Sequence, residues 1–174
     1  MTAQKSIKCP QCGMVSYNPN DVEERYCGNC HEYHDDMVVE VRGSLPRKSP
    51  CASCPYRKNV PSGVWHEEEY DKLVTYDGDI PEQVEKGGTA AFGCHQGDGS
   101  ICSGWLGHRD PLDLIAVRLG LSLGNLDSSC ANYTTDVPLF ATGAEASEHG
   151  KREIEKPSPE AIKMSQKIVR KRDL

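Results

Sequence analysis

The chain has 174 residues, of which 37% are hydrophobic, and it contains 9 cysteines but only 2 phenylalanines and 2 tryptophans. This length allows one ordinary domain or two small units, and the few large apolar residues argue against a large core, so metals or disulfides are expected to stabilise the fold. The net charge of −6 argues against a protein that coats nucleic acid along its whole surface.

The N-terminal sequence MTAQKSIKCPQCG has no apolar segment of the signal-peptide type, and no apolar run reaches the length of a membrane span. We therefore expect a cytoplasmic protein that has no membrane partner. In a reducing compartment, cysteines are thiols or metal thiolates rather than disulfides. The odd number of cysteines agrees with this expectation.

Residues 1–42 contain two CxxC motifs separated by 14 residues and end in an apolar run at 37–41 that predicts a strand. Each motif makes a tight turn that directs two sulfurs to one metal, and Gly13 and Gly28 supply the backbone freedom such turns need. Four thiolates arranged as a tetrahedron are the closed geometry of structural zinc. The sequence thus predicts a zinc ribbon, in which His31 or His34 in place of Cys30 is an alternative ligand. The predicted ligands of this first site are Cys9, Cys12, Cys27 and Cys30.

Two enzyme-like patterns overlap these residues. CGNCH, which ends at His31, matches a haem attachment motif, but that attachment normally follows export and leaves the first CxxC unexplained. Glu32, together with Cys30 and the PCASC motif at 50–54, imitates a zinc deaminase, but the interval before Pro50 leaves no room for a deaminase sheet. We predict no catalytic residue from either pattern.

Residues 43–50 (GSLPRKSP) indicate a linker, and residues 51–140 a second, cysteine-rich unit. A glycine-rich loop joins Cys94 to Cys102, so these two cysteines and the CxxC at 51–54 are able to close a second metal site. Zinc, an iron–sulfur cluster and no metal all remain open for this site, and His95 is a further candidate ligand. Cys130 is expected to be a buried thiol. The predicted ligands of the second site are Cys51, Cys54, Cys94 and Cys102.

A redox dithiol is an alternative interpretation of the second CxxC. Nearby positive charge lowers a thiol pKa, and basic residues flank this motif on both sides, but no βαβ pattern surrounds it. The flanking basic residues are Arg47, Lys48, Arg57 and Lys58.

Two or three short helices are expected in the second unit, at residues 64–74, 81–86 and 110–120, with a strand over 89–94. The polar segment 141–157 is expected to be disordered. A last helix begins at Ser158, with a narrow apolar stripe that includes Ala161, Ser165 and Ile168.

The formal charge changes from −5 in residues 47–140 to +2 in residues 141–174. This reversal makes the flexible tail, with its short basic helix, a candidate anchor for nucleic acid or an acidic partner. Its basic residues are Lys163, Lys167, Arg170, Lys171 and Arg172.

The motif CPQCG…NPNDVEERYCGNCHEY resembles N-terminal zinc ribbons of small actinobacterial and actinobacteriophage proteins. CASCPYRKNVPSGVW, followed by FGCHQ and CSGWL, resembles a domain of unknown function from the same hosts and phages. The resemblance covers residues 8–34 and 51–125. It implies an actinobacterial or phage origin, marks the four cysteines of the second site as matching positions, and supplies no activity.

Together these observations predict a small α+β protein with two metal-stabilised units and a basic C-terminal helix. We expect a metal-binding interaction or regulatory protein that acts through contacts with a protein or a nucleic acid, since zinc ribbons commonly serve as docking surfaces. The alternative is an iron–sulfur or thiol-based redox sensor or enzyme centred on the second cysteine cluster.

Overall fold

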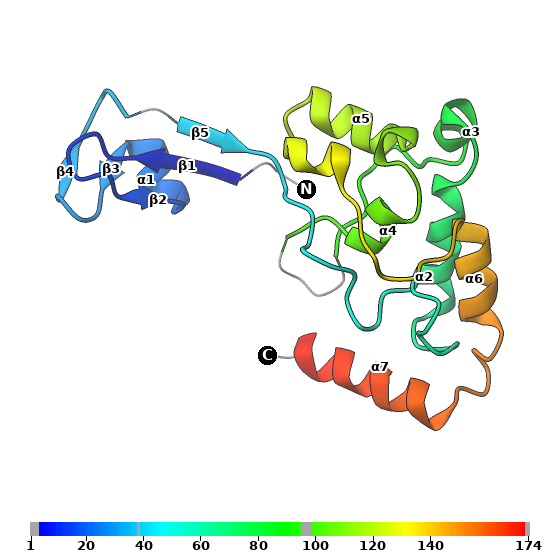
Figure 1. The fold of residues 1–174 in the computed structure, drawn as a ribbon. Coiled ribbons are helices and arrows are strands. Elements are labelled where there is room, and N and C mark those ends of the chain that lie inside the picture. The colour runs from blue at the N-terminus through cyan, green and yellow to red at the C-terminus, as the bar shows by residue number, and fades with distance from the viewer. Residues whose placement is uncertain (1–3, 38, 95–98, 173–174) are drawn as a thin grey trace.

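The computed structural model describes residues 4–37, 39–94 and 99–172 (Figure 1). Short strands and one helix come first along the chain, and helices dominate after residue 66. The described residues form seven α-helices and two small antiparallel sheets, so the fold is a small mixed one. None of these helices is long and apolar enough to cross a membrane.

The N-terminal lobe, residues 4–42, contains both sheets. In the larger sheet the central strand β1 pairs with β2 on one side and β5 on the other, and Ile7 lies opposite Ser16 and Val39. The strand expected at 37–41 is therefore present as β5, and Val38 lies outside the described residues. The strands are β1 (Gln4–Lys8), β2 (Val15–Ser16), β3 (Tyr26–Cys27), β4 (Glu32–Tyr33) and β5 (Val39–Arg42).

Helix α1 (Pro19–Glu24) connects the two halves of this lobe. The Asn18 side chain accepts a hydrogen bond from the Asn20 N–H, and Pro19 occupies the first turn, so the sequence NPN starts the helix. Arg25 ends it in the left-handed region at φ +53°. The lobe has a small core, in which two of the five buried residues are cysteines: Ile7, Cys9, Val22, Cys27 and Met37.

The expected linker at 43–50 runs against the second unit. Ser44 forms a bridge with Leu126, and Pro46 forms one with Ile101. A Cβ atom at Gly43 would lie 2.1 Å from the Leu126 carbonyl carbon, so this close approach requires glycine. The expected domain boundaries themselves stay a prediction.

The second unit contains the three expected helical segments in modified form. The segment 64–74 is split into α2 and the 3₁₀ helix η1, and 110–120 into η2 and α5, whereas the capping box of Asp79 and Glu82 starts α3. The short helix α4 was not predicted, and within the described part of 89–94 the pairing is one bridge, from Gly93 to Ile101. The elements are α2 (Glu67–Asp71), η1 (Lys72–Tyr76), α3 (Ile80–Glu85), α4 (Ser103–Gly107), η2 (Pro111–Asp113), α5 (Ile115–Ser122) and η3 (Ser128–Asn132).

Tyrosines enlarge the core of this unit beyond what the phenylalanine and tryptophan content suggests. Tyr56 and Tyr70 are fully buried, and the Tyr76 ring packs edge-on against Phe92 and Trp105 at centroid distances of 5.8 and 5.2 Å. Aromatic side chains bury large apolar areas, so a few of them suffice for a domain of this size.

Helix α6 (Gly143–Lys151) replaces the disordered segment expected at 141–157. It packs against α2 and η1 (Figure 1), and small residues permit the close approach. A Cβ at Gly150 would lie 2.0 Å from the Tyr70 ring, and one at Gly143 would lie 2.1 Å from the Leu73 carbonyl oxygen. The Asp77 carboxylate accepts hydrogen bonds from two N–H groups at the start of the helix, both 2.6 Å long. The glycine and alanine residues of α6 therefore form a surface that packs closely against α2 and η1.

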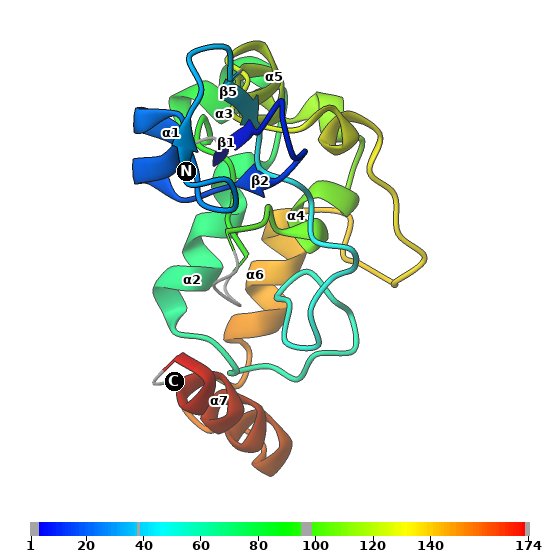
Figure 2. The same ribbon diagram turned by 90° about the vertical axis from the view of Figure 1, so that its left-hand side faces the viewer.

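Helix α7 (Pro159–Arg172) lies below the ends of α2 and α6 (Figure 2). Ser158 accepts a hydrogen bond from the Ala161 N–H, as its capping position predicts. Ala161 is buried, Ile168 packs against the core, and the Ser165 hydroxyl donates to the Val64 carbonyl at 2.7 Å. The expected apolar stripe therefore docks this helix onto the second unit.

His108 makes the second unit sensitive to pH. Burial, with a smaller contribution from Arg109, lowers the pKa of His108 to about 4, and its Nδ1 hydrogen-bonds the Trp105 carbonyl. In the unfolded chain His108 is protonated near its ordinary pKa of 6.5, whereas in the folded chain it stays neutral down to about pH 4. The folded state therefore loses stability relative to the unfolded state as pH falls from 6.5 towards 4. We expect a loss of about 2 kcal/mol in unfolding free energy between about pH 7 and about pH 5 from this residue.

Urea unfolding of the wild type and of His108→Asn at several pH values measures this contribution. The Asn side chain keeps an N–H donor but does not titrate, so the variant should show a flatter pH dependence. Parallel curves for the two proteins would show that His108 does not cause the acid sensitivity.

Candidate metal centres

The first cysteine cluster is built from two tight turns. In the first turn the Gly13 N–H donates to the Cys9 carbonyl at 2.9 Å, and in the second the His31 N–H donates to the Cys27 carbonyl at 2.8 Å. Gly13 has φ +73°, as expected for a glycine after the second cysteine of a knuckle. The equivalent left-handed position of the second turn is His31, at φ +56°, rather than the expected Gly28.

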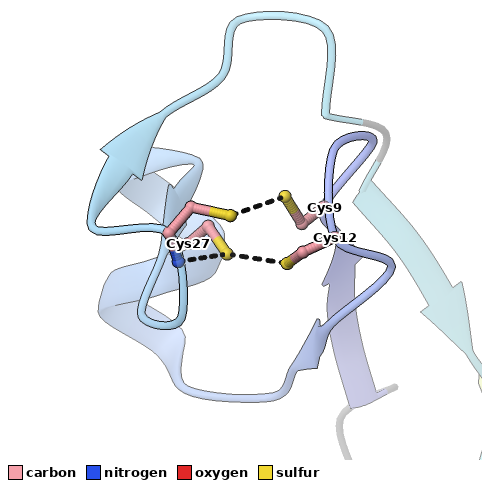
Figure 3. Close-up of side chains that lie close together, drawn as sticks. Cys9, Cys12 and Cys27 are labelled. Atoms are coloured by element: carbon pink, nitrogen blue, oxygen red, sulfur yellow. Dashed lines mark hydrogen bonds between the residues drawn. The ribbon is translucent and has the colours of Figure 1, made fainter.

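The four sulfurs of this cluster converge on one point. Figure 3 shows Cys9 and Cys12 facing the side that carries Cys27. Cys9 Sγ lies 3.9 Å from Cys30 Sγ, Cys12 Sγ lies 3.5 Å from Cys27 Sγ, and all four Sγ atoms lie within 4.8 Å of one another. A tetrahedral ion with metal–sulfur bonds of about 2.3 Å requires sulfur–sulfur distances of about 3.8 Å. The cluster therefore fits a four-coordinate metal ion.

Unequal thiol acidities accompany this geometry. A backbone hydrogen bond from Met14, followed by hydrogen bonding to Cys30, lowers the pKa of Cys12 to about 6. The same Cys12–Cys30 contact raises the pKa of Cys30, because two adjacent thiols do not readily lose both protons. A metal ion bound here would replace these shared protons, since it is the thiolate that binds metals.

The neighbouring histidines flank the four-cysteine set. His34 Nε2 lies 3.6 Å from Cys9 Sγ, and His31 Nδ1 lies 3.0 Å from the Tyr26 hydroxyl. Four sulfurs already complete a tetrahedron, so neither histidine is needed in place of Cys30. The position of Cys30 in this cluster also removes it from the deaminase pattern, which would pair it with the second CxxC.

The second cysteine cluster combines a turn with a short hairpin. The Cys54 N–H donates to the Cys51 carbonyl at 3.0 Å and closes the CxxC turn. The Gly93–Ile101 bridge brings Cys94 near Cys102, with the Cys102 N–H bonded to the Phe92 carbonyl at 2.8 Å. The loop that contains His95 lies outside the described residues.

Side-chain hydrogen bonds connect the four sulfurs of this cluster in a chain. Cys51 interacts with Cys54 and with Cys94, and Cys54 also interacts with Cys102. Cys54 and Cys102 are buried, whereas Cys51 and Cys94 are half-buried. In the described parts of the sequence, only the first cluster brings all its donor atoms within 4.8 Å. The sulfurs of the second set are thus neighbours, but they do not all lie within 4.8 Å of one another.

Thiol pKa values alternate in direction from Cys51 through Cys54 to Cys102. Hydrogen bonds with Cys54 and, to a smaller extent, with Cys94 lower the pKa of Cys51. A hydrogen bond with Cys54 also lowers the pKa of Cys102, whose sulfur accepts further hydrogen bonds from the backbone N–H groups of Trp105 and Gly104. The shared contacts raise the pKa of Cys54. The lowered pKa values favour the thiolate, the state that a metal requires, at Cys51 and Cys102, whereas Cys54 favours the protonated thiol.

Cys130 belongs to neither cluster. Its buried Sγ lies 3.5 Å from the Ser44 carbonyl oxygen, and burial raises its pKa to about 11. It is thus a packed thiol, as expected.

The basic residues of the tail line two different hollows beside α7. Lys163 and Lys167 line a cavity of about 610 Å³ together with Cys51 of the second cluster. Arg170 lines a separate hollow next to Gly63. The side chains of residues 171 and 172 lie outside the described set. The sequence showed the four-residue spacing of the two lysines but not the cysteine opposite them.

Comparison with curated proteins finds no match, and comparison with solved structures finds none either. The resemblance to actinobacterial and phage proteins stays a prediction. A family of unknown function, DUF6283, matches residues 46–172, which is 127 of the 174 residues. This match includes the second cysteine cluster and leaves out the first. The chain therefore belongs to the family of unknown function DUF6283.

Proposed function

We propose that the chain is a metal-binding interaction protein whose N-terminal lobe is a zinc ribbon that docks on a protein partner. The observation that carries the metal assignment is the convergence of four Sγ atoms within 4.8 Å. Four thiolates leave no open coordination position, which is typical of structural zinc rather than catalytic zinc. The ribbon is therefore a scaffold, and its surface performs the function.

The surface of this lobe favours a protein partner. Four large apolar side chains are exposed by 42% to 68%, a high number for so small a lobe. Residues 1–46 carry 7 acidic and 4 basic side chains, so a nucleic-acid backbone is repelled and a partner with basic groups is attracted. Tyrosine and methionine are also enriched in protein interfaces. The exposed residues are Met14, Val15, Tyr17 and Tyr33.

Paired substitutions test this docking surface. Tyr17→Ser/Tyr33→Ser removes two exposed rings of the ribbon, and Ile162→Ser/Val169→Ser removes two exposed apolar side chains from α7 as the matched control. We expect the tagged wild type and the control to capture the same protein from the native host, and the tyrosine variant to lose it while keeping its zinc. Loss of about 2 kcal/mol per anchor corresponds to more than tenfold weaker binding.

Equal capture by all three proteins would contradict the ribbon surface as the docking site. Capture of nucleic acid instead of protein, abolished by nuclease, would contradict the choice of partner.

A second candidate function is an iron–sulfur or thiol-based redox sensor at the second cluster. The observation that favours it is a set of buried polar groups in the segments next to these cysteines. The Tyr56 hydroxyl, the Ser103 hydroxyl and the Trp105 Nε1 are buried and have no hydrogen-bond partner among the described residues. Donors of this kind bond to cluster sulfurs and adjust the reduction potential. The half-buried Cys51 and the cavity beside it give this centre access to solvent.

Metal analysis of anaerobically isolated protein distinguishes zinc from an iron–sulfur cluster at the second cysteine cluster. We expect two metal centres per chain, at least one of them zinc. A brown protein with iron and visible absorbance indicates an iron–sulfur cluster, and a colourless protein with two zinc ions indicates zinc in both centres. A single zinc with no iron would remove the second metal centre and leave its four cysteines as packing residues.

A further inference from the structure

The cavity between α7 and the second CxxC turn has the properties of a small-ligand site. Its volume of about 610 Å³ lies within the range of roughly 300–1,000 Å³ of small-molecule pockets. One wall is the turn with Cys51, and the other is the face of α7 that presents Lys163 and Lys167. The remaining lining residues are Arg47, Ala52, Ser53, Glu160, Met164 and Ile168.

The same two-residue segment fixes both walls. Trp65 Nε1 donates to the Ser53 carbonyl of the turn at 2.6 Å, and the adjacent Val64 carbonyl accepts the Ser165 hydroxyl of α7 at 2.7 Å. Trp65 and Val64 are themselves buried. The cavity is therefore held open by the core and does not depend on a ligand for its shape, which lowers the entropic cost of binding.

Charge identifies the ligand class. Three cations and one carboxylate line the cavity together with Cys51, so the side chains other than the cysteine carry a positive excess, although the chain as a whole has net charge −6. Arg47 is directed to the cysteine cluster, with its guanidinium 3.9 Å from Cys94 Sγ. Lys163 and Lys167 are exposed on successive turns of α7 and supply the charge for a ligand.

We propose that this cavity binds a small organic anion, with a phosphate or carboxylate group held by Lys163 and Lys167. Its apolar part contacts Met164 and Ile168, which are half-buried along the same wall. The ligand lies against the Cys51 edge of the second cluster and so couples ligand binding to that centre. This inference goes beyond the ribbon function, and it stands whichever metal the second cluster holds.

Two probe molecules distinguish the contribution of charge to binding from the contribution of apolar contact. The full-length, metal-loaded protein is titrated with phenyl phosphate and with inorganic phosphate at low salt, and binding is followed by calorimetry and by the amide NMR signals of Ala52 and Ser53. We expect phenyl phosphate to bind more tightly, because only its ring reaches the apolar wall. Lys163→Gln/Lys167→Gln should weaken its binding about tenfold or more. Glu160→Gln should strengthen it, because a repulsive carboxylate is removed.

Lys156→Gln/Arg170→Gln is the matched control, since it removes the same charge from residues that line other hollows. This control should keep phenyl phosphate affinity within about twofold of the wild type. Equal weakening in both double variants, or no wild-type binding at about 1 mM, would overturn the proposal. Loss of metal from Lys163→Gln/Lys167→Gln, without a change in affinity per folded molecule, would show that the lysines only balance the charge of the cluster.

A short DNA duplex is the third probe. If the duplex displaces phenyl phosphate and its binding falls steeply with salt, the lysines are a nucleic-acid anchor and the small-ligand proposal is wrong. A result that overturns the small-ligand proposal does not affect the proposed function of the ribbon, because none of the substituted residues lies in the N-terminal lobe.

Discussion

Cys12→Ser and Cys27→Ser are expected to unfold the N-terminal lobe to the same extent, although the two cysteines differ in burial. Cys27 is buried and belongs to the small core of the lobe, whereas Cys12 is exposed. If packing alone held the lobe together, only the Cys27 variant would be damaged. If metal ligation holds it, each variant loses one of four ligands and the cost is equal.

The expected effect is large because the lobe has few other sources of stability. Its core contains five buried residues, two of them ligands. Zinc binding to comparable small sites contributes about 10–16 kcal/mol to folding, so loss of one ligand removes a large part of the stability of this lobe. Residues 4–42 should lose their dispersed NMR signals while the second unit keeps its own.

Gln11→Ser is the matched control, since Gln11 is exposed and lies between the two cysteines of the first knuckle. It should retain one zinc per ribbon and the signals of Tyr17 and Tyr26. Full zinc content and unchanged tyrosine signals in both cysteine variants would show that the cluster is not the stabilising centre.

Local spacing explains which features were predictable. A CxxC turn brings two sulfurs together within four residues, so the motifs that begin at Cys9 and Cys27 predict the first cluster without any tertiary contact. The predicted cap was equally local: the Ser158–Pro159 start of α7 is present as a side-chain to backbone hydrogen bond. Such signals depend on neighbours in sequence alone.

Tertiary contacts explain which features were missed. Gly143 and Gly150 look like components of a disordered stretch, and they are required where α6 meets Leu73 and Tyr70. The cavity near Cys51 is formed by residues more than 100 positions apart, so its pairing with Lys163 has no local signal. Composition describes how much a segment is able to bury, and only the fold shows what it is packed against.

Gly104→Ala is expected to destabilise the second unit, opposite to the usual effect of this substitution in a helix. Alanine normally stabilises a helix interior by about 1 kcal/mol relative to glycine. Gly104 lies in α4, where a Cβ atom would meet Cys54 Sγ at 2.1 Å. This sulfur is buried and also contacts Cys51 and Cys102, so it has no space into which to move. The unfolding free energy should fall by about 1–3 kcal/mol, and any metal bound at the second cysteine cluster should be lost.

Gly107→Ala in the same helix is the control, because a Cβ there meets the ends of half-buried side chains, Thr135 Cγ2 at 2.8 Å and Tyr133 Cε1 at 3.2 Å, rather than a buried sulfur. Its unfolding free energy should stay within about 1 kcal/mol of the wild type. Denaturant unfolding and metal analysis of both variants provide the comparison.

A double-mutant cycle assigns the cause to the sulfur itself. In a Cys54→Ala background the obstructing Sγ is gone, and the nearest remaining atoms, Tyr56 Cβ and Cys54 Cβ, lie at 3.5 and 3.6 Å from the added methyl group, which is ordinary contact. The cost of Gly104→Ala should therefore disappear in that background, which gives a coupling energy of about 1–3 kcal/mol between the two sites. An equal cost in both backgrounds would mean that the glycine is required for the backbone of α4. It would also remove the argument that the second cluster is packed tightly around Cys54.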